Sequence, residues 1–194
     1  MKGVGICAMF LLAAAAGCGI LGGPGKMDPA TSTQVDALLR EANTSLRYSI
    51  ESERHASEYP ANSEAAQLFS KASKLHLQAA LDKAYEAYNL EKNWPLTNKV
   101  LALCKSKMGE SDKAIQFAER AMALDPKMDE LMDVVGSEYV RKGINATDPS
   151  TKKKYYNKAI DAYETFIRKH PDHISVPYLE STVGYLQEEI KKLK

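Results

Sequence analysis

The stretch LALCKSKMGESDKAIQFAERAMALDP, residues 101–126, decides the fold. It carries the motif Asp112-Lys113-Ala114, which returns upstream as Asp82-Lys83-Ala84 and downstream as Asn157-Lys158-Ala159. The chain after residue 30 is rich in Ala, Leu, Glu, Lys and Gln, which favour helices, and its β-branched residues form no alternating run. A unit that recurs along such a sequence predicts helices paired into repeats.

The segments around this motif resemble the tetratricopeptide repeat (TPR), a helix-turn-helix unit of about 34 residues. In the repeat that ends at Pro126, the matching positions are Leu101, Ala102, Gly109, Ala114, Ala121 and Pro126. In the next repeat, they are Val135, Gly136, Tyr139, Gly143, Ala159, Tyr163 and Pro171. Lys105 and Ala118 replace aromatic residues of the family pattern, and Phe166 replaces a small one. The resemblance implies an all-α, TPR-like helix-turn-helix solenoid with two repeats in residues 94–194.

The second repeat contains an insertion near residues 144–154. Gly143 and Ala159 lie 16 positions apart, far more than the family pattern has. Asp148 can cap a new helix, and Pro149 fits the first turn of that helix. We therefore expect a loop followed by an early extension of the second helix.

The last segment of the chain predicts one more helix, beginning near Ser175 and Pro177. Its apolar residues all fall on one face: Leu179, Val183, Leu186 and Ile190. A helix that is apolar on one side only can seal the end of a solenoid, so we expect a C-terminal capping helix.

Residues 32–93 are predicted to be helical, but their repeat character is open. An apolar stripe of helical spacing comprises Val35, Leu38, Leu39, Ala42 and Leu46. A break follows at Pro60, with Asn62 or Ser63 as the next cap. A second apolar stripe comprises Leu68, Phe69, Ala72, Leu75 and Ala79. This second part is either one long helix or a degenerate repeat that turns at Ala79.

The beginning of the chain has the layout of a secretory signal peptide, predicted over residues 1–17. Lys2 precedes an apolar run from Val4 to Ala16, and small residues follow. The Gly-rich residues 18–31 are predicted to be a flexible tether.

The box Ala15-Ala16-Gly17-Cys18 resembles the lipobox of bacterial lipoproteins, although Leu is usual where Ala15 stands. The resemblance implies cleavage after Gly17 and a lipid on Cys18. A plain signal peptide and an uncleaved anchor are the alternatives. Gly19, rather than Asp, follows the cysteine, which favours the periplasmic face of the outer membrane over the inner membrane. We therefore expect a lipid-anchored protein of the cell envelope.

The charge balance argues against nucleic acid as a partner. The chain has 26 basic and 25 acidic side chains, and removal of a leader containing Lys2 leaves 25 of each. Binding of phosphates needs a basic surplus, which such a chain does not have overall.

No catalytic or cofactor motif stands out, so we expect neither an enzyme nor a cofactor-binding protein. The sequence has no Gly-rich phosphate loop and no His-Glu-x-x-His motif. Cys104 is the single cysteine after Cys18, so no internal disulfide is expected in the processed chain. The cluster His170-Pro171-Asp172-His173 leaves a metal site as a rival hypothesis to a solvated turn.

TPR domains bind extended peptides or protein surfaces on their concave side. The resemblance implies a groove here that is lined by Lys99, Leu103, Ser106, Lys107, Glu130, Asp133, Ser137 and Arg141. Leu103 and Glu130 stand where chaperone-binding TPRs have Asn and Lys, so their carboxylate clamp is not expected. The mixed signs of charge in the groove favour a partner with patterned charge.

We therefore expect a membrane-tethered adaptor that docks another envelope protein, as the pilus-assembly and outer-membrane-assembly TPR lipoproteins do. The alternative is a periplasmic component of a solute-uptake system that associates with a substrate-binding protein or a small apolar ligand. An apolar channel between the upstream helices and the repeats would distinguish this alternative.

Overall fold

The computed structural model describes residues 27–193, and this part of the chain is all-helical. Its elements are α1 (Pro29–Ser57), α2 (Glu64–Leu90), α3 (Pro95–Lys107), α4 (Ser111–Leu124), the short 3₁₀ helix η1 (Pro126–Met128), α5 (Leu131–Asn145), α6 (Pro149–Lys169) and α7 (Val176–Lys192). The prediction of an all-α fold is confirmed. The predicted signal peptide and the predicted tether up to residue 26, including Cys18, lie outside the described residues.

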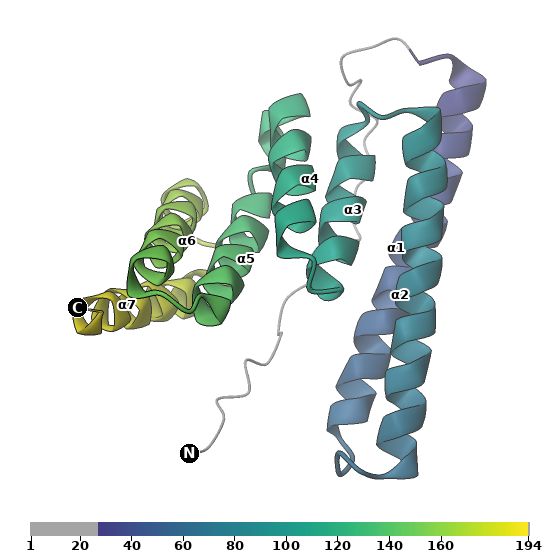
Figure 1. Cartoon of the computed structure of the whole chain (residues 1–194). Coiled ribbons are helices and arrows are strands. Elements are labelled where there is room, and N and C mark those ends of the chain that lie inside the picture. The colour runs from purple at the N-terminus through teal and green to yellow at the C-terminus, as the bar shows by residue number, and fades with distance from the viewer. Residues whose placement is uncertain (1–26, 194) are drawn as a thin grey trace.

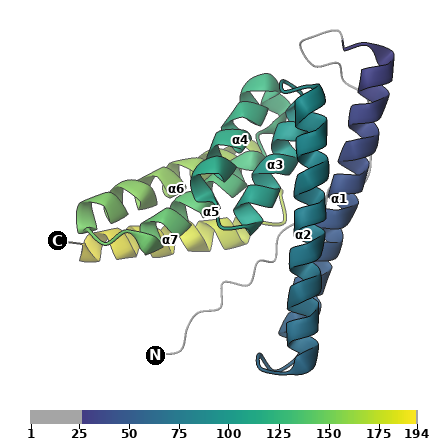
Figure 2. The ribbon, with the colours of Figure 1, turned by 45° about the vertical axis from the view of Figure 1, so that its right-hand side comes forward.

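Consecutive helices pair as antiparallel hairpins, α1/α2, α3/α4 and α5/α6, which stand side by side in chain order (Figures 1 and 2). Helix α7 packs on α6 at the end of the row. Apolar side chains fill the seams between the hairpins in three clusters, one joining α1 and α2 to α3, one around α4 and α5, and one between α6 and α7. No helix in residues 27–193 has the length and apolar character needed to cross a membrane.

The hairpin α3/α4 turns at Gly109, whose φ of 77° is a left-handed conformation that suits glycine. The Gly109 N–H donates to the Ser106 carbonyl, and the Glu110 N–H donates to the Lys105 carbonyl, at 3.0 Å each. This pair of bonds is the Schellman motif, which closes a helix and reverses the chain.

The hairpin α5/α6 is held close by two glycines inside α5. A Cβ added at Gly136 would lie 2.4 Å from Cε1 of Tyr163, and one added at Gly143 would lie 2.4 Å from Cε1 of Tyr156. Both tyrosines are buried. Gly143 therefore does not serve as a turn residue, unlike Gly109, because α5 continues to Asn145.

The predicted insertion lengthens α6 at its start. Asp148 caps this helix by accepting a hydrogen bond from the Thr151 N–H at 2.8 Å, and Pro149 lies in the first turn. Residues 146–148 form the short loop before this helix, and the early turns of α6 carry Tyr156 onto Gly143.

The segment upstream of α3 is one long hairpin. Ser63 caps α2 by accepting from the Ala66 N–H, and α2 runs unbroken through Ala79. Helix α1 begins at Pro29, inside the range predicted for the tether, because Asp28 accepts hydrogen bonds from the N–H groups of Ala30 and Thr31.

The predicted apolar stripe of α2 is wrong about the face that is buried. Leu68 and Leu75 are 65% and 63% exposed, and Ala79 is exposed. The buried residues of α2 are mostly small, Ala66, Ser73, Ala80, Ala84 and Ala87, together with Leu77 and Leu81. The hydroxyls of Ser49 and Ser73 share a buried hydrogen bond of 3.0 Å between the two helices. Small side chains let α1 and α2 approach closely, and Leu68 and Leu75 lie on the other side of the helix.

The hairpin α1/α2 extends beyond its neighbours. Its helices have 29 and 27 residues, whereas α3 has 13. Lys107, at the end of α3, reaches Glu53 at 2.5 Å, and the hairpin continues past this point (Figure 1). We call residues 47–79 the arm.

Candidate functional site

Four of the eight residues predicted to line the groove pair with one another between α3 and the start and middle of α5. Lys99 Nζ lies 2.8 Å from Glu130 Oε1. The Ser106 hydroxyl donates to Glu138 Oε1 at 2.5 Å, and Arg141 Nη1 donates to the Ser106 carbonyl at 2.8 Å. These contacts join the first helices of two successive hairpins.

Glu138 is the centre of this junction, although its place in the sequence does not distinguish it from a solvated residue of a helix. Its side chain is fully buried, and its second carboxylate oxygen lies 3.1 Å from Arg141 Nη1. That contact has the distance of an ion pair but not the geometry of a hydrogen bond. A buried carboxylate with such partners fixes how α5 packs against α3.

The remaining groove residues divide between the core and the surface. Leu103 is buried in the cluster that joins α2 to α3. Lys107 points to Glu53 of the arm. The Ser137 hydroxyl lies 3.2 Å from the hydroxyl of Tyr163, so it ties α5 to α6.

Asp133 is the one predicted groove residue whose pKa is strongly shifted. Burial raises the pKa of its carboxyl to about 6. Its Oδ1 atom is buried and has no hydrogen-bond partner in the described part of the chain. The charged form of Asp133 is therefore disfavoured in the fold.

His170 and His173 pack on one aromatic ring. Their rings lie 4.9 Å and 5.1 Å from the ring of Phe166, measured between centroids. His170 Nε2 lies 2.9 Å from Asp129 Oδ1, and Nδ1 of His173 accepts from the Ser175 N–H. Within residues 27–193, no group of three His, Cys, Asp or Glu side chains is arranged to hold a metal ion.

Asp129 fastens this end of α6 to the turn after η1. Burial alone would raise the pKa of the Asp129 carboxyl, but hydrogen bonds from Lys169 and His170 outweigh it and lower the pKa. Asp129 is thus a charged anchor for two basic side chains at the end of α6, where the helix dipole also favours positive charge.

Cys104 is buried in the seam between α2 and α3. Burial raises the pKa of its thiol to about 12, so the nucleophilic thiolate is scarce at neutral pH. Lys105, next to it, is 5% exposed; its Nζ reaches Glu110 at 2.9 Å and lies 5.6 Å from the centre of the Tyr85 ring.

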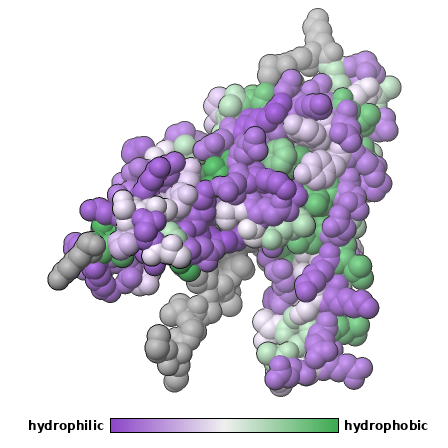
Figure 3. Space-filling view, in the orientation of Figure 1, coloured by the Kyte–Doolittle hydropathy of each residue, from purple (hydrophilic) through white to green (hydrophobic). Residues whose placement is uncertain are grey.

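The outer face of α2 on the arm carries a row of apolar residues, of which Leu68, Leu75 and Ala79 are exposed and Ala65 and Ala72 are partly buried. They follow helical spacing and comprise Ala65, Leu68, Ala72, Leu75 and Ala79. Lys71 and Lys74 are exposed beside them and take part in no ion pair among residues 27–193. Figure 3 shows hydrophobic residues at intervals along the arm, among hydrophilic ones. We call this row of alanines and leucines the arm stripe.

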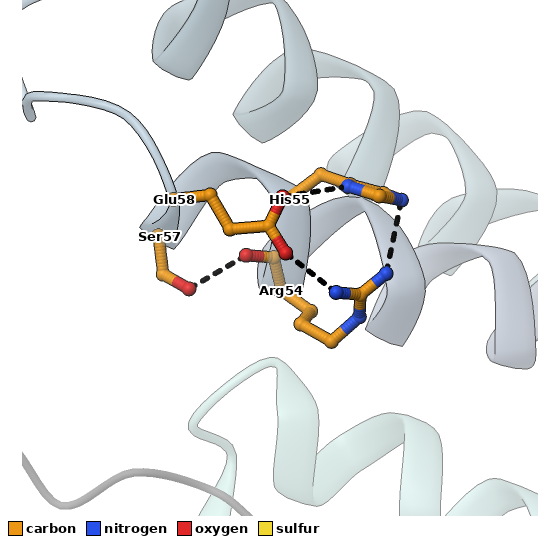
Figure 4. Close-up of polar contacts among 4 residues, drawn as sticks. All are labelled: Arg54, His55, Ser57 and Glu58. Carbon is orange, nitrogen blue, oxygen red and sulfur yellow. Dashed lines mark hydrogen bonds and ion pairs between the residues drawn. The ribbon is translucent and has the colours of Figure 1, made fainter.

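The tip of the arm is aromatic on one side and polar on the other. The ring of Phe69 stacks on His55 at 5.3 Å and on Tyr59 at 5.8 Å. Figure 4 shows the polar side, where Glu58 accepts from Arg54 at 2.5 Å and pairs with Nδ1 of His55 at 3.1 Å.

The neighbouring Ser57 does not complete a catalytic group with these residues. Its hydroxyl donates to the backbone carbonyl of Arg54 at 2.6 Å and not to the imidazole of His55 (Figure 4). The cluster is therefore a solvated end of α1, where basic side chains near the last carbonyls are favourable.

A shallow hollow of about 320 Å³ lies where α5 joins α6. Its walls are Lys142, Asn145, Ala146, Thr147, Asp148, Thr151 and Tyr155. Lys142 pairs with Asp112 and lies 4.7 Å from the centre of the Tyr155 ring. Two donors that line the hollow, Lys142 and the Thr151 N–H, already have partners within the fold.

No family model, no curated protein and no solved structure matches this chain. The site is therefore interpreted from its own geometry.

Proposed function

We propose that the protein is a non-enzymatic adaptor of the bacterial cell envelope, built from TPR-like hairpins and tethered by a lipid on Cys18. It binds another envelope protein, at the periplasmic face of the outer membrane. The observation that carries this proposal is the arm, which extends beyond the row of hairpins with Leu68 and Leu75 exposed.

The close contact of Gly136 with Tyr163 supports the TPR-like assignment of the hairpins. In a TPR, small residues of the first helix receive a large residue of the second, and these two positions follow that pattern. The turn at Gly109 and the stacking of hairpins in chain order agree with it.

The arm stripe has the chemistry of a surface that receives a helix. Alternating alanines and leucines at spacings of three and four residues form a shallow ridge that fits an amphipathic helix. Lys71 and Lys74 at its side favour a partner helix with acidic residues along one flank. Several polar groove residues between α3 and α5, in contrast, already have hydrogen-bond or ion-pair partners within the fold.

Co-purification from solubilised native membranes tests the docking surface. We expect wild type to retain a partner that contains an acidic amphipathic helix, and Leu68→Glu/Leu75→Glu to lose it. The matched control is Ile174→Glu/Tyr185→Glu, which alters two residues that are 87% and 62% exposed outside the arm. Absence of any stable partner, or an arm variant that binds like wild type, contradicts the proposal.

Mass spectrometry of the mature N-terminus tests the tether separately. The proposal predicts a chain that begins at Cys18 and carries acyl groups. A mature chain that begins elsewhere, without lipid, contradicts the tether and leaves the adaptor role to be judged by the co-purification.

The solute-uptake alternative requires an apolar channel between the upstream helices and the repeats. Packed side chains occupy that seam, among them Ala84, Ala87, Val100 and Cys104, each at most 2% exposed. This packing favours the adaptor over a carrier of small apolar ligands.

A further inference from the structure

A basic surface lies at the end of the row of hairpins, far from the start of α1 (Figures 1 and 2). Between residues 141 and 158 the chain has six basic side chains and one acidic side chain, although the whole chain is almost neutral. Three of the basic residues are consecutive, Lys152, Lys153 and Lys154, and Lys158 follows one turn after Lys154. We call these four lysines the basic patch.

The basic patch has no acidic partner in the part of the chain that the structure describes. Its four lysines take part in none of the ion pairs found there. The two lysines near the end of α7, by contrast, pair with Glu188 and Glu189. Lys153, Lys154 and Lys158 are exposed, so their charges face solvent.

Stability of α6 does not explain these lysines. Lys152, Lys153 and Lys154 are the fourth to sixth residues of α6, near the end where the helix dipole disfavours positive charge, and the first turn has no acidic residue. Asp148 supplies the cap by itself. Since these three lysines have no ion-pair partner inside the described fold, their charge indicates a contact outside it.

We propose that the basic patch lies against anionic phospholipid headgroups, so that the protein contacts the membrane at this end as well as through the lipid on Cys18. Its four cationic residues are all lysines, compact charges that suit the diffuse attraction of a charged bilayer more than the bidentate recognition that arginine provides. Tyrosines lie beside the patch: Tyr139 and Tyr155 stack at 6.2 Å, and Lys158 Nζ lies 4.9 Å from the centre of the Tyr139 ring. Tyrosine is a common residue at membrane interfaces.

This inference rests on the proposed tether, because a tethered chain meets headgroups at high local concentration. With the tether at the start of α1 and the patch at the far end of the row, two attachments fix the orientation of the molecule. The acidic partner helix proposed for the arm is a separate contact on a separate surface.

Sedimentation with vesicles tests the basic patch without the lipid anchor. The chain from residue 18 with Cys18→Ser is mixed with vesicles of one part phosphatidylglycerol to two parts phosphatidylcholine. We expect binding that salt reverses and that pure phosphatidylcholine does not support. Lys152→Gln/Lys153→Gln/Lys154→Gln should lower the partition coefficient about tenfold or more, since each lysine near an anionic surface contributes appreciably.

The matched control is Arg40→Gln/Lys92→Gln/Lys127→Gln, which removes the same charge from exposed basic residues outside both the arm and the basic patch; we expect less than about a twofold effect. Equal loss in both variants, or no preference for phosphatidylglycerol, overturns the inference. Binding to soluble polyglutamate but not to the vesicles also overturns it, in favour of an acidic protein. Competition by inorganic phosphate beyond the effect of matched salt overturns it in favour of a small anion.

The outcomes of this experiment are separable from those of the proposed function. If the protein does not bind vesicles but its arm still binds a partner protein, the proposed adaptor function stands. If the protein binds vesicles but no partner protein is found for the arm, the proposed membrane contact stands.

Discussion

Gly136→Ala should destabilise the protein although alanine is the better helix former. The new Cβ would lie 2.4, 2.6 and 2.9 Å from Cε1, Cδ1 and Cζ of Tyr163. That ring is 3% exposed and its hydroxyl is hydrogen-bonded to Ser137, so it cannot move aside freely. Overpacking of this kind costs about 1–3 kcal/mol, and alanine regains up to about 1 kcal/mol of helix propensity. We expect a net loss of about 1 kcal/mol in the free energy of unfolding.

Gly184→Ala is the matched control, because Gly184 lies inside α7 with open space around its added Cβ. This variant should gain about 0.5–1 kcal/mol from helix propensity alone. Urea unfolding followed by far-UV circular dichroism measures both. Gly136→Ala/Tyr163→Leu should recover part of the loss, since the smaller side chain vacates the space. A Gly136→Ala variant as stable as wild type or more stable would refute the close pairing of α5 and α6.

Three further predictions concern buried polar groups. Burial raises the pKa of Asp133 from 3.8 to about 6; the folded state therefore binds the proton more tightly, and stability falls as the pH rises through this window. Asp133→Asn should thus raise the free energy of unfolding by about 2 kcal/mol at neutral pH and by little at about pH 4, measured by urea titration at both. Cys104, with a pKa raised to about 12, should react with a thiol reagent only after unfolding; fast reaction of the native Cys18→Ser chain from residue 18 would contradict its burial. Glu138→Ala should cost about 3 kcal/mol by leaving the Ser106 hydroxyl without its acceptor and Arg141 without its ion-pair partner, with Glu138→Gln milder; equal stability of all three proteins in urea would remove its role as the junction.

The helices could be predicted from the sequence where their ends carry specific chemistry. Asp148 and Pro149 mark the start of α6, and Ser63 marks the start of α2, because capping side chains act locally. The extension of α6 follows from the same signals. These features depend on neighbours in the chain and not on the packing of distant helices.

The buried face of α2 could not be predicted, because the size of the apolar side chains on this helix does not indicate which face is buried. Leu68 and Leu75 are the largest aliphatic residues of the predicted stripe, yet the close approach of α1 selects the small residues Ala66 and Ser73. Two apolar rows run along α2, and only the partner helix decides which one is the core. The stripe left outside is what suggests a docking surface.

The helices that carry the predicted groove residues could be predicted, but the pairing of these residues could not. The structure places Lys99 and Ser106 on α3, Glu130 just before α5 and Arg141 on α5, and it brings these helices together. That their charges satisfy one another depends on the register of α3 against α5, which spacing along one chain does not contain. Glu138 was missed for the same reason, since an acidic residue in a helix is usually solvated.

Photocrosslinking from position 75 tests the central claim of a protein-docking arm most directly. A photoreactive amino acid replaces Leu75 in one protein and Ile174 in another, both in native cells. We predict an adduct of defined mass from position 75, containing an acidic amphipathic helix of another envelope protein, with little from position 174; Leu68→Glu should suppress it. No adduct from position 75, or adducts of equal yield from both positions, would contradict the account.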